Sequence, residues 1–285
     1  MALSTAPGRG DEAARVQWDA AADGWNGQTP QIRAWLAEAT VTMLDMADVR
    51  PGMHVLDVAA GSGDQSGDAA RRVGPGGTVL ATDVSPRMIA AAAINLRAAG
   101  QDQVRTLVAD GAALGLDDSN FDAAICRLGL MFLADPVRGL QEVRRALRPG
   151  GRFCAMVFAE AAHNPCIGIV VSIAMRHAGL PVGDPYRRGS LLSLGPPGLI
   201  EETFRSAGFV DVEVQRVDAP LRLASVEGYL GFLRTAAGPV MTILDRIDEA
   251  SRRAAWAEIA EALAPFASPR GWEAPTGLLL ASGAR

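Results

Sequence analysis

Lysine is missing from this sequence: all 27 Lys and Arg residues are arginine, and the formal net charge is −5. The arginines are scattered apart from short pairs, so the chain has no basic stripe of the kind that nucleic-acid binding requires. Histidine and cysteine are scarce, with three of each. The cysteines lie among apolar neighbours without CxxC spacing, which favours buried, reduced thiols over a disulfide framework or a zinc site. Because the arginines form no basic stripe, we predict no nucleic-acid partner.

Long hydrophobic runs are also missing. No apolar run is long enough to span a bilayer, and residues 1–10 lack the apolar core of a signal peptide. The chain has 285 residues, of which 49% are hydrophobic and 21% are charged. This composition is ordinary for a globular protein that can bury a full core. We therefore expect a soluble, cytoplasmic protein without a membrane span.

Residues 1–50 are predicted to form a flexible tail of about 12 residues, followed by an N-terminal helical cap. Three of the five tryptophans fall in the cap, at Trp18, Trp25 and Trp35. Trp35 fits packing of the cap against the rest of the chain. Trp18 and Trp25 fit either such packing or closure over a ligand, and Trp25 is included among the predicted ligand contacts.

From residue 51 onward, short apolar strands alternate with helices. The predicted strands cover residues 55–58, 78–82, 104–109, 121–126 and 152–158, and the helices between them cover 64–73, 86–100 and 136–147. Beyond residue 159 the alternation loosens into helices at 165–179, 197–207, 225–236 and 240–263, with strands at 209–217 and 276–282. Alternating strands and helices of this kind predict a doubly wound α/β fold with a parallel sheet covered on both faces.

The turn after the first strand is rich in small residues, and it runs from Ala59 through Ala60 to Gly61 and Gly63. Small residues let the backbone approach a ligand closely, and glycine tolerates unusual dihedral angles. A strand, a tight turn and a helix start in this order suit a nucleotide-like ligand. Taken alone, the turn fits mere tight packing equally well.

Two acids at successive strand ends favour the ligand interpretation. Asp83 ends the second strand 20 positions after Gly63, close to the spacing expected for a carboxylate that holds ribose hydroxyls. Asp110, followed by Gly111, ends the third strand and could accept a hydrogen bond from an adenine amine. Each acid alone would fit a helix N-cap. Side chains at the carboxyl ends of parallel strands converge on one edge of the sheet, where such folds bind their ligands.

At this point the sequence resembles the class I S-adenosylmethionine-dependent methyltransferases, and most of all the branch that contains the ubiquinone/menaquinone C-methyltransferases. The resemblance covers about residues 50–160 and is carried by residues 55–64, 81–88, 109–114, 121–132 and 147–152. It implies a Rossmann-like methyltransferase domain over residues 51–285 with lid segments at about 160–195 and 220–270. It also implies a seven-stranded, mostly parallel sheet whose last strand is antiparallel.

The resemblance assigns the methionine end of the cofactor to the first turn. Asp57 is implied to orient this turn near the methionine amine, while Gly61 and Gly63 allow its close passage. Arg127 is implied to supply backbone at the same end. Ala59 stands where the family usually has its first glycine, which is a mild substitution.

The ribose and the adenine are assigned to the next two strand ends. By the resemblance, Asp83 binds the ribose hydroxyls, and Val84 and Met88 flank the adenine. Asp110 and Gly111 hold the adenine edge. Together with the first turn, these residues form a three-part site for S-adenosyl-L-methionine, whose product is S-adenosyl-L-homocysteine.

The expected reaction is an in-line displacement. A sulfonium methyl group is already activated, so the protein mainly aligns a nucleophile and excludes water. The lid segments are rich in Leu, Ile, Val and Met, which predicts a small, apolar or aromatic acceptor with an O, N or C nucleophile. His163, just after the fifth strand, is the candidate general base at the mouth of the pocket, although it fits a plain loop histidine as well. A homodimer is compatible with the sequence.

Other functions remain open at this stage. An NAD-dependent oxidoreductase would share the glycine turn and Asp83, but it gives no reason for Asp110 and Gly111, and a Tyr-x-x-x-Lys pair cannot exist without lysine. A non-catalytic cofactor-binding partner subunit would keep the whole pattern. The metal-dependent catechol type needs acids at the end of the fourth strand, whereas Asp117 and Asp118 precede it, so we expect no metal.

Overall fold

The computed structural model describes residues 9–269 and 271–285, and its centre is a seven-stranded sheet in the order β3-β2-β1-β4-β5-β10-β6. The first five strands pair in parallel, and β10 pairs antiparallel with both β5 and β6. The predicted doubly wound, mostly parallel sheet with an antiparallel last strand is therefore confirmed. The strands are β1 (His54–Val58), β2 (Thr78–Asp83), β3 (Val104–Val108), β4 (Phe121–Arg127), β5 (Leu147–Phe158), β6 (Val210–Asp218) and β10 (Gly277–Ala284).

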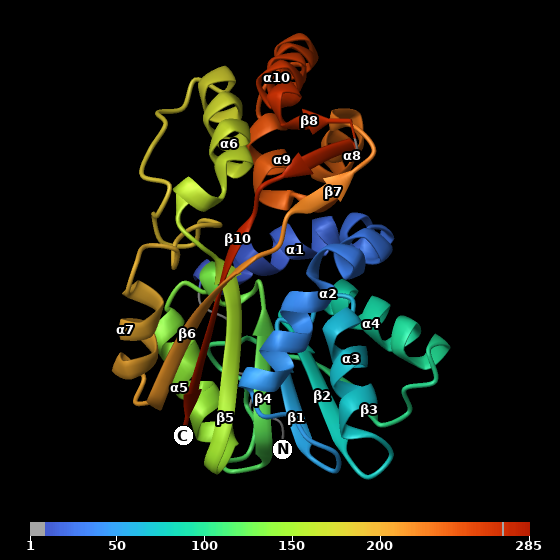
Figure 1. Ribbon diagram of the computed structural model, residues 1–285, viewed down its shortest axis with the longest axis vertical. Coiled ribbons are helices and arrows are strands. Elements are labelled where there is room, and N and C mark those ends of the chain that lie inside the picture. Colours follow the sequence, from blue (N-terminus) through green and yellow to red (C-terminus); the bar gives the residue numbers. More distant parts are fainter. Residues whose placement is uncertain (1–8, 270) are drawn as a thin grey trace.

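Helices cover both faces of this sheet (Figure 1). The helices that cover it are α2 (Thr29–Met46), α3 (Asp64–Val73), α4 (Pro86–Ala98), α5 (Pro136–Ala146) and α7 (Leu199–Ser206). Local chemistry starts two of them: the Ser85 side chain accepts from Met88 N at the start of α4, and Asp135 accepts from Arg138 N at the start of α5. Proline follows each cap, where its missing N–H costs nothing.

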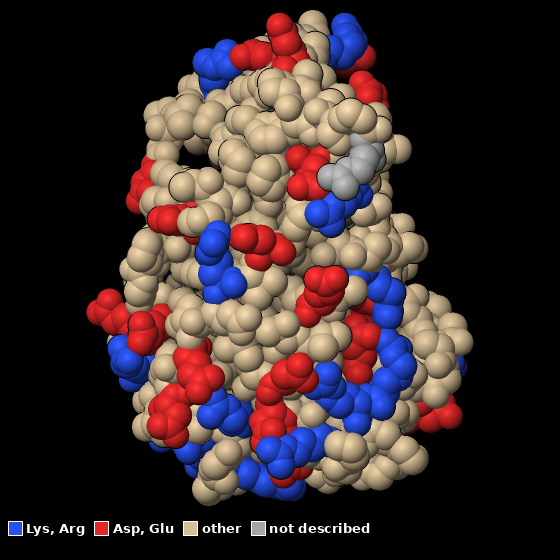
Figure 2. Space-filling view, viewed as in Figure 1, with Lys and Arg blue, Asp and Glu red and all other residues tan. Residues whose placement is uncertain are grey.

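An upper layer of helices stands beyond the carboxyl ends of the parallel strands. It contains α6 (Pro165–His177), α8 (Val226–Ala236), α9 (Gly238–Leu244) and α10 (Glu249–Leu263), and a three-stranded sheet of β7 (Leu221–Leu223), β8 (Ala267–Ser268) and β9 (Gly271–Ala274). Helix α1 (Arg9–Gly27) runs between the upper layer and the sheet (Figure 1). Figure 2 shows charged side chains gathered over the sheet layer on this face, while much of the upper layer is uncharged.

The structure departs from the expected elements in the upper layer and at the N-terminus. The small β7–β9 sheet was not predicted, because strands of two to four residues carry no measurable periodicity. The helix expected over 240–263 is two helices, since Asp248 caps α10 by accepting from Ser251 N. Helix α1 begins at Arg9, inside the predicted tail, whose first eight residues lie outside the described part of the chain.

Candidate active site

The turn after β1 places backbone, rather than side chains, at the end of the sheet. Ala59 and Gly61 both adopt left-handed conformations, with φ of 56° and 55°. Ala60 N donates to Thr82 O at 2.9 Å, which ties the turn to β2. Ala59, Ala60 and Gly61 line a cavity at the strand ends, which we call the strand-end cavity. An alanine at φ 56° carries a strain that a glycine would not.

Asp83 lies at the same edge, one strand away. Its two carboxylate oxygens accept from Gly61 N and Ser85 N, both at 2.9 Å, and the residue is 8% exposed. Burial raises the pKa of this carboxyl above its usual value, against the backbone hydrogen bonds that lower it. Asp83, Val84 and Met88 all line the strand-end cavity. A carboxylate has further lone pairs, so these contacts leave capacity for ligand hydroxyls.

The third strand end completes this wall. Asp110 and Gly111 line the strand-end cavity, and Asp110 Oδ1 accepts from Ala112 N at 2.8 Å. The three strand ends that the sequence singled out therefore meet at one cavity. The parallel order β3-β2-β1 explains why, because it brings their carboxyl ends side by side.

Two of the predicted contacts lie behind the cavity wall. Asp57 is fully buried, and its carboxylate accepts from Ser66 Oγ at 2.5 Å and from Gln65 Nε2 at 3.3 Å. Burial raises its pKa to about 7. Gln65 lines the strand-end cavity, so Asp57 contributes to this cavity indirectly, by holding the Gln65 side chain. Gly63, with φ 87°, is not among the lining residues, and its place is set by packing against α4.

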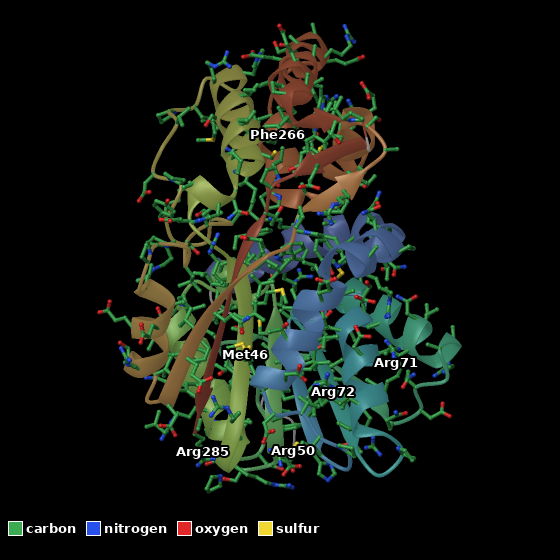
Figure 3. All side chains as sticks on the ribbon, viewed as in Figure 1. Met46, Arg50, Arg71, Arg72, Phe266 and Arg285 are labelled. Atoms are coloured by element: carbon green, nitrogen blue, oxygen red, sulfur yellow. The ribbon has the colours of Figure 1, made fainter. Side chains whose placement is uncertain are left out.

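Arg127 lines the strand-end cavity at the end of β4, but its guanidinium is turned away from it. It donates to Asp64 Oδ2 at 2.8 Å and to Thr40 Oγ1 at 3.0 Å in a buried ion pair. On that side a groove between α2 and α3 carries Arg71 and Arg72, which project from α3 in Figure 3. The cavity therefore meets the Arg127 backbone rather than its charge.

Helix α1 closes the strand-end cavity from above. Trp18 and Trp25 both line it, and their rings meet edge to face with centroids 6.1 Å apart. Trp18 also meets Phe132 edge to face at 5.1 Å. The helix is held in place because Asp19 accepts from Ser85 Oγ and from Arg87 N at the start of α4. Trp18 was weighed as a ligand contact but was not among the predicted site residues.

A second cavity, which we call the aromatic cavity, adjoins the first. It shares Trp18, Trp25, Leu128 and Phe132 with the strand-end cavity. Its remaining lining comes mainly from the upper layer. These residues are Trp35, Met131, Phe158, Cys166, Ile167, Leu191, Leu221, Tyr229, Phe232, Leu233, Ala236, Ala237, Pro239, Ala274, Pro275 and Thr276.

The aromatic cavity has no charged lining among the described residues: no Asp, Glu, His or Arg faces it. Trp35, which we expected only to pack the cap, stacks on Phe158 and donates to Ala219 O at 2.6 Å. Leu128, on the shared wall, adopts φ 57°, a left-handed conformation that is strained for a branched side chain. The segment that follows β4 belongs to the motif at residues 121–132, but its sequence did not indicate which of its side chains face a cavity.

His163 does not lie where the sequence suggested. It ends a 3₁₀ turn (Ala161–His163) and lines a separate hollow with Glu160, Glu201 and Arg216, which shares no described lining residue with either cavity. Asn164 explains the placement, because its Nδ2 donates to Ala159 O and Gly277 O, both at 3.0 Å. The chain after β5 is thereby turned toward β10. The expected position at the mouth of the acceptor pocket is wrong.

Two further properties of the described residues concern metal binding and membrane insertion. No group of three or more His, Cys, Asp and Glu side chains is arranged to hold a metal ion within residues 9–269 and 271–285. Over the same residues, none of the helices is both long and apolar enough to cross a membrane.

Known proteins resemble this chain in sequence. The profile of the ubiE/COQ5 methyltransferase family matches residues 31–169. The chain is 32% identical over 200 residues to nocamycin O-methyltransferase of Saccharothrix syringae, which covers 67% of this chain and 71% of that enzyme. It is 36% identical over 118 residues to the ubiquinone/menaquinone biosynthesis C-methyltransferase UbiE of Idiomarina loihiensis, covering 41% of this chain and 47% of that enzyme. The match spans about half the length of that relative.

The fold is shared with solved structures as well. The YcgJ protein from Bacillus subtilis aligns with a TM-score of 0.58 at 16% identity, covering 87% of this chain and 98% of that one. An alignment at this identity speaks for the fold alone. The family profile and the Saccharothrix enzyme speak for the activity. The chain belongs to the class I S-adenosylmethionine-dependent methyltransferases.

Proposed function

We propose that this methyltransferase acts on a small, apolar or aromatic acceptor that binds in the aromatic cavity. The observation that carries the proposal is that the two cavities adjoin along Trp18, Trp25, Leu128 and Phe132. The lining of the strand-end cavity includes the acids Asp83 and Asp110, whereas no charged residue is found in the described lining of the aromatic cavity. A cofactor on one side of these shared residues and an acceptor on the other would meet there.

The residues of the strand-end cavity fit S-adenosylmethionine. The buried Asp83 carboxylate suits the ribose hydroxyls, with Val84 and Met88 beside the adenine and Asp110 and Gly111 at its edge. A Cβ on Gly61 would lie 3.2 Å from Trp25 Nε1, so the bare glycine backbone keeps the space below Trp25 open. Residues 59–61 and the Arg127 backbone then face the methionine end, with Asp57 and Gln65 behind them.

Methyl transfer requires the protein mainly to align the two reactants. The bound cofactor supplies a methyl group that is already activated by its sulfonium. An O, N or C atom of an acceptor held in line would bond to that methyl carbon, and the electron pair of the broken carbon–sulfur bond would stay on sulfur. Any proton on the acceptor is released to bulk solvent rather than to a protein base, because none of the described side chains that line the aromatic cavity is a carboxylate or a histidine. Exclusion of water and in-line orientation are the main contributions of the chain.

The parts of the chain outside the sheet layer would then control access. We assign the described part of the predicted tail and cap, residues 9–50, to a cap over the cofactor, and segments 160–195 and 220–270 to a lid over the acceptor. The aromatic cavity is lined by Trp18 and Trp25 of α1 and, from the lid, by Ile167, Leu191 and six residues between Tyr229 and Pro239.

Two measurements test the proposal. Titration calorimetry should give tight binding of S-adenosylhomocysteine and none of NAD, and the reverse result would indicate an oxidoreductase. Radiolabelled S-adenosylmethionine, incubated with the protein and a panel of phenols, quinols and amines, should label at least one aromatic acceptor. Transfer only to charged, non-aromatic acceptors would contradict the assignment of the aromatic cavity.

A further inference from the structure

The Tyr229 side chain brings an unused hydrogen-bond donor to the aromatic cavity. Tyr229 belongs to α8, is 5% exposed and stacks on Trp272 with ring centroids 4.5 Å apart. Among the described residues its hydroxyl has no hydrogen-bond partner. The hydroxyl is not among the fully enclosed unpaired atoms of the described residues, so it keeps accessible surface on a side chain that is otherwise buried. Tyrosine hydroxyls in such surroundings normally find a partner. The missing partner points to a ligand atom in the cavity.

Two other polar side chains of the same cavity, away from the wall that it shares with the strand-end cavity, are already engaged. Trp35 Nε1 donates to Ala219 O at 2.6 Å, and Thr276 Oγ1 donates to Ala274 O at 3.2 Å. The chain's second tyrosine, Tyr186, lies outside both cavities, and its hydroxyl accepts from Ala161 N at 3.1 Å. The contrast between the two tyrosines shows that the open hydroxyl of Tyr229 is a feature of its site.

Tyr229 stays protonated at neutral pH. Burial, followed by the nearby Cys166 thiol, raises the pKa of its hydroxyl above the usual value. Burial also raises the pKa of Cys166 to about 12. Both groups therefore offer a proton for hydrogen bonding and neither serves as a base.

We propose that Tyr229 is a positioning residue that donates a hydrogen bond to an oxygen of the acceptor, and that the acceptor is an uncharged aromatic molecule bearing a hydroxyl or carbonyl group. The inference rests on the proposed function, because it takes the aromatic cavity as the acceptor site. The rings of Trp35, Phe158 and Phe232 suit a flat hydrocarbon body. The open hydroxyl of Tyr229 then holds the oxygen that the hydrocarbon walls would otherwise leave unsatisfied.

The same surroundings exclude charged acceptors. A carboxylate or phosphate in this cavity would be buried without any described cationic side chain to pair with it. An unpaired buried charge costs far more than a hydrogen bond from one tyrosine returns.

The experiment compares three probes by titration calorimetry, with and without S-adenosylhomocysteine: 2-naphthol, naphthalene and 2-naphthoate. The wild-type protein should bind 2-naphthol about tenfold more tightly than naphthalene, the effect of one hydrogen bond. It should bind 2-naphthoate at least tenfold more weakly than 2-naphthol. Tyr229→Phe should bind naphthalene as the wild type does and lose the preference for 2-naphthol, whereas Tyr186→Phe should keep it.

The outcomes separate the two proposals. Equal binding of 2-naphthoate and 2-naphthol, no binding of either naphthol or naphthalene, or a preference that survives in Tyr229→Phe would overturn the inference. Tight binding of S-adenosylhomocysteine alongside any of these results would leave the cofactor assignment standing. Failure of S-adenosylhomocysteine to bind the wild type would instead contradict the cofactor assignment. The preference for 2-naphthol over naphthalene would still be measured by the titrations without S-adenosylhomocysteine. The wild-type comparison of naphthol with naphthoate holds even if a variant does not fold.

Discussion

The strand-end cavity and the aromatic cavity meet at one wall, yet they are built on different plans. The first is made by neighbouring strand ends of the sheet, with backbone, the buried carboxylate of Asp83 and the half-buried carboxylate of Asp110. The second is made by side chains from α1, α2, α6, α8 and the small upper sheet, and its described lining is uncharged. The difference separates a site defined by backbone geometry from one defined by side-chain volume. Substitutions in one should leave the other's ligand largely unaffected.

The largest effect is expected at Asp83. Asp83→Ala removes the acceptor for two ribose hydroxyls, and two charge-assisted hydrogen bonds correspond to about 4 kcal/mol, or about a thousandfold in affinity. Calorimetry with S-adenosylhomocysteine should show this loss while 2-naphthol still binds. Asp135→Ala removes a helix cap outside both cavities and serves as the control. Unchanged cofactor affinity in Asp83→Ala would refute the assignment of this carboxylate.

The next effect concerns the close approach of two strand ends. A Cβ on Gly129 would lie 2.3 Å from Ala59 Cβ, so Gly129→Ala should overpack the wall and lower the free energy of unfolding by about 2 kcal/mol. Adding Ala59→Gly removes that contact and relaxes the left-handed φ of residue 59. The double variant should therefore regain most of the stability in urea denaturation. If the two changes were simply additive, the contact would not be the cause.

Asp57 gives the strand-end side a pH dependence that the aromatic side lacks. Its folded pKa of about 7 lies above the unfolded value of 3.8, because burial favours the protonated form. The folded state then binds more protons, so this contribution to stability is fully present below about pH 4 and is lost by about pH 7. The loss is at most about 1.4 kcal/mol for each pH unit. Asp57→Asn should flatten the fall of the urea midpoint between pH 5 and 7; the same slope in both proteins would sink this account.

The smallest effect is expected at Ile167, on the aromatic side. Ile167→Ala widens this cavity and should weaken 2-naphthol binding by a few fold, about 1 kcal/mol of lost contact. The affinity for S-adenosylhomocysteine should stay within twofold, because Ile167 does not line the strand-end cavity. Ile94, which is 69% exposed on α4, provides a matched Ile→Ala control. A large loss of cofactor affinity in Ile167→Ala would mean that the two cavities are coupled.

Much of the strand-end cavity could be read from the sequence because local signals define it. Strand ends, a small-residue turn and acids at a fixed spacing recur along 50 to 110, and parallel pairing brings them together. Gly63 and Asp57 show the limit of that reasoning. Both belong to the motif, but both lie behind the cavity wall. Gly63 packs against α4, and the Asp57 carboxylate accepts hydrogen bonds from Gln65 and Ser66.

The sequence by itself determined the alternating strands and helices of the sheet layer and the edge at which their acids and small-residue turn meet, since short-range patterning and strand-end chemistry are properties of contiguous segments. Only the tertiary structure decided the acceptor side. Trp18, Phe158 and Tyr229 are distant in the chain and meet because α1 and α8 pack over the sheet. It also decided that His163 is turned aside by Asn164 and β10. Long-range packing has no signature in local sequence, so a cavity made of side chains from many elements becomes visible only once those elements are in place.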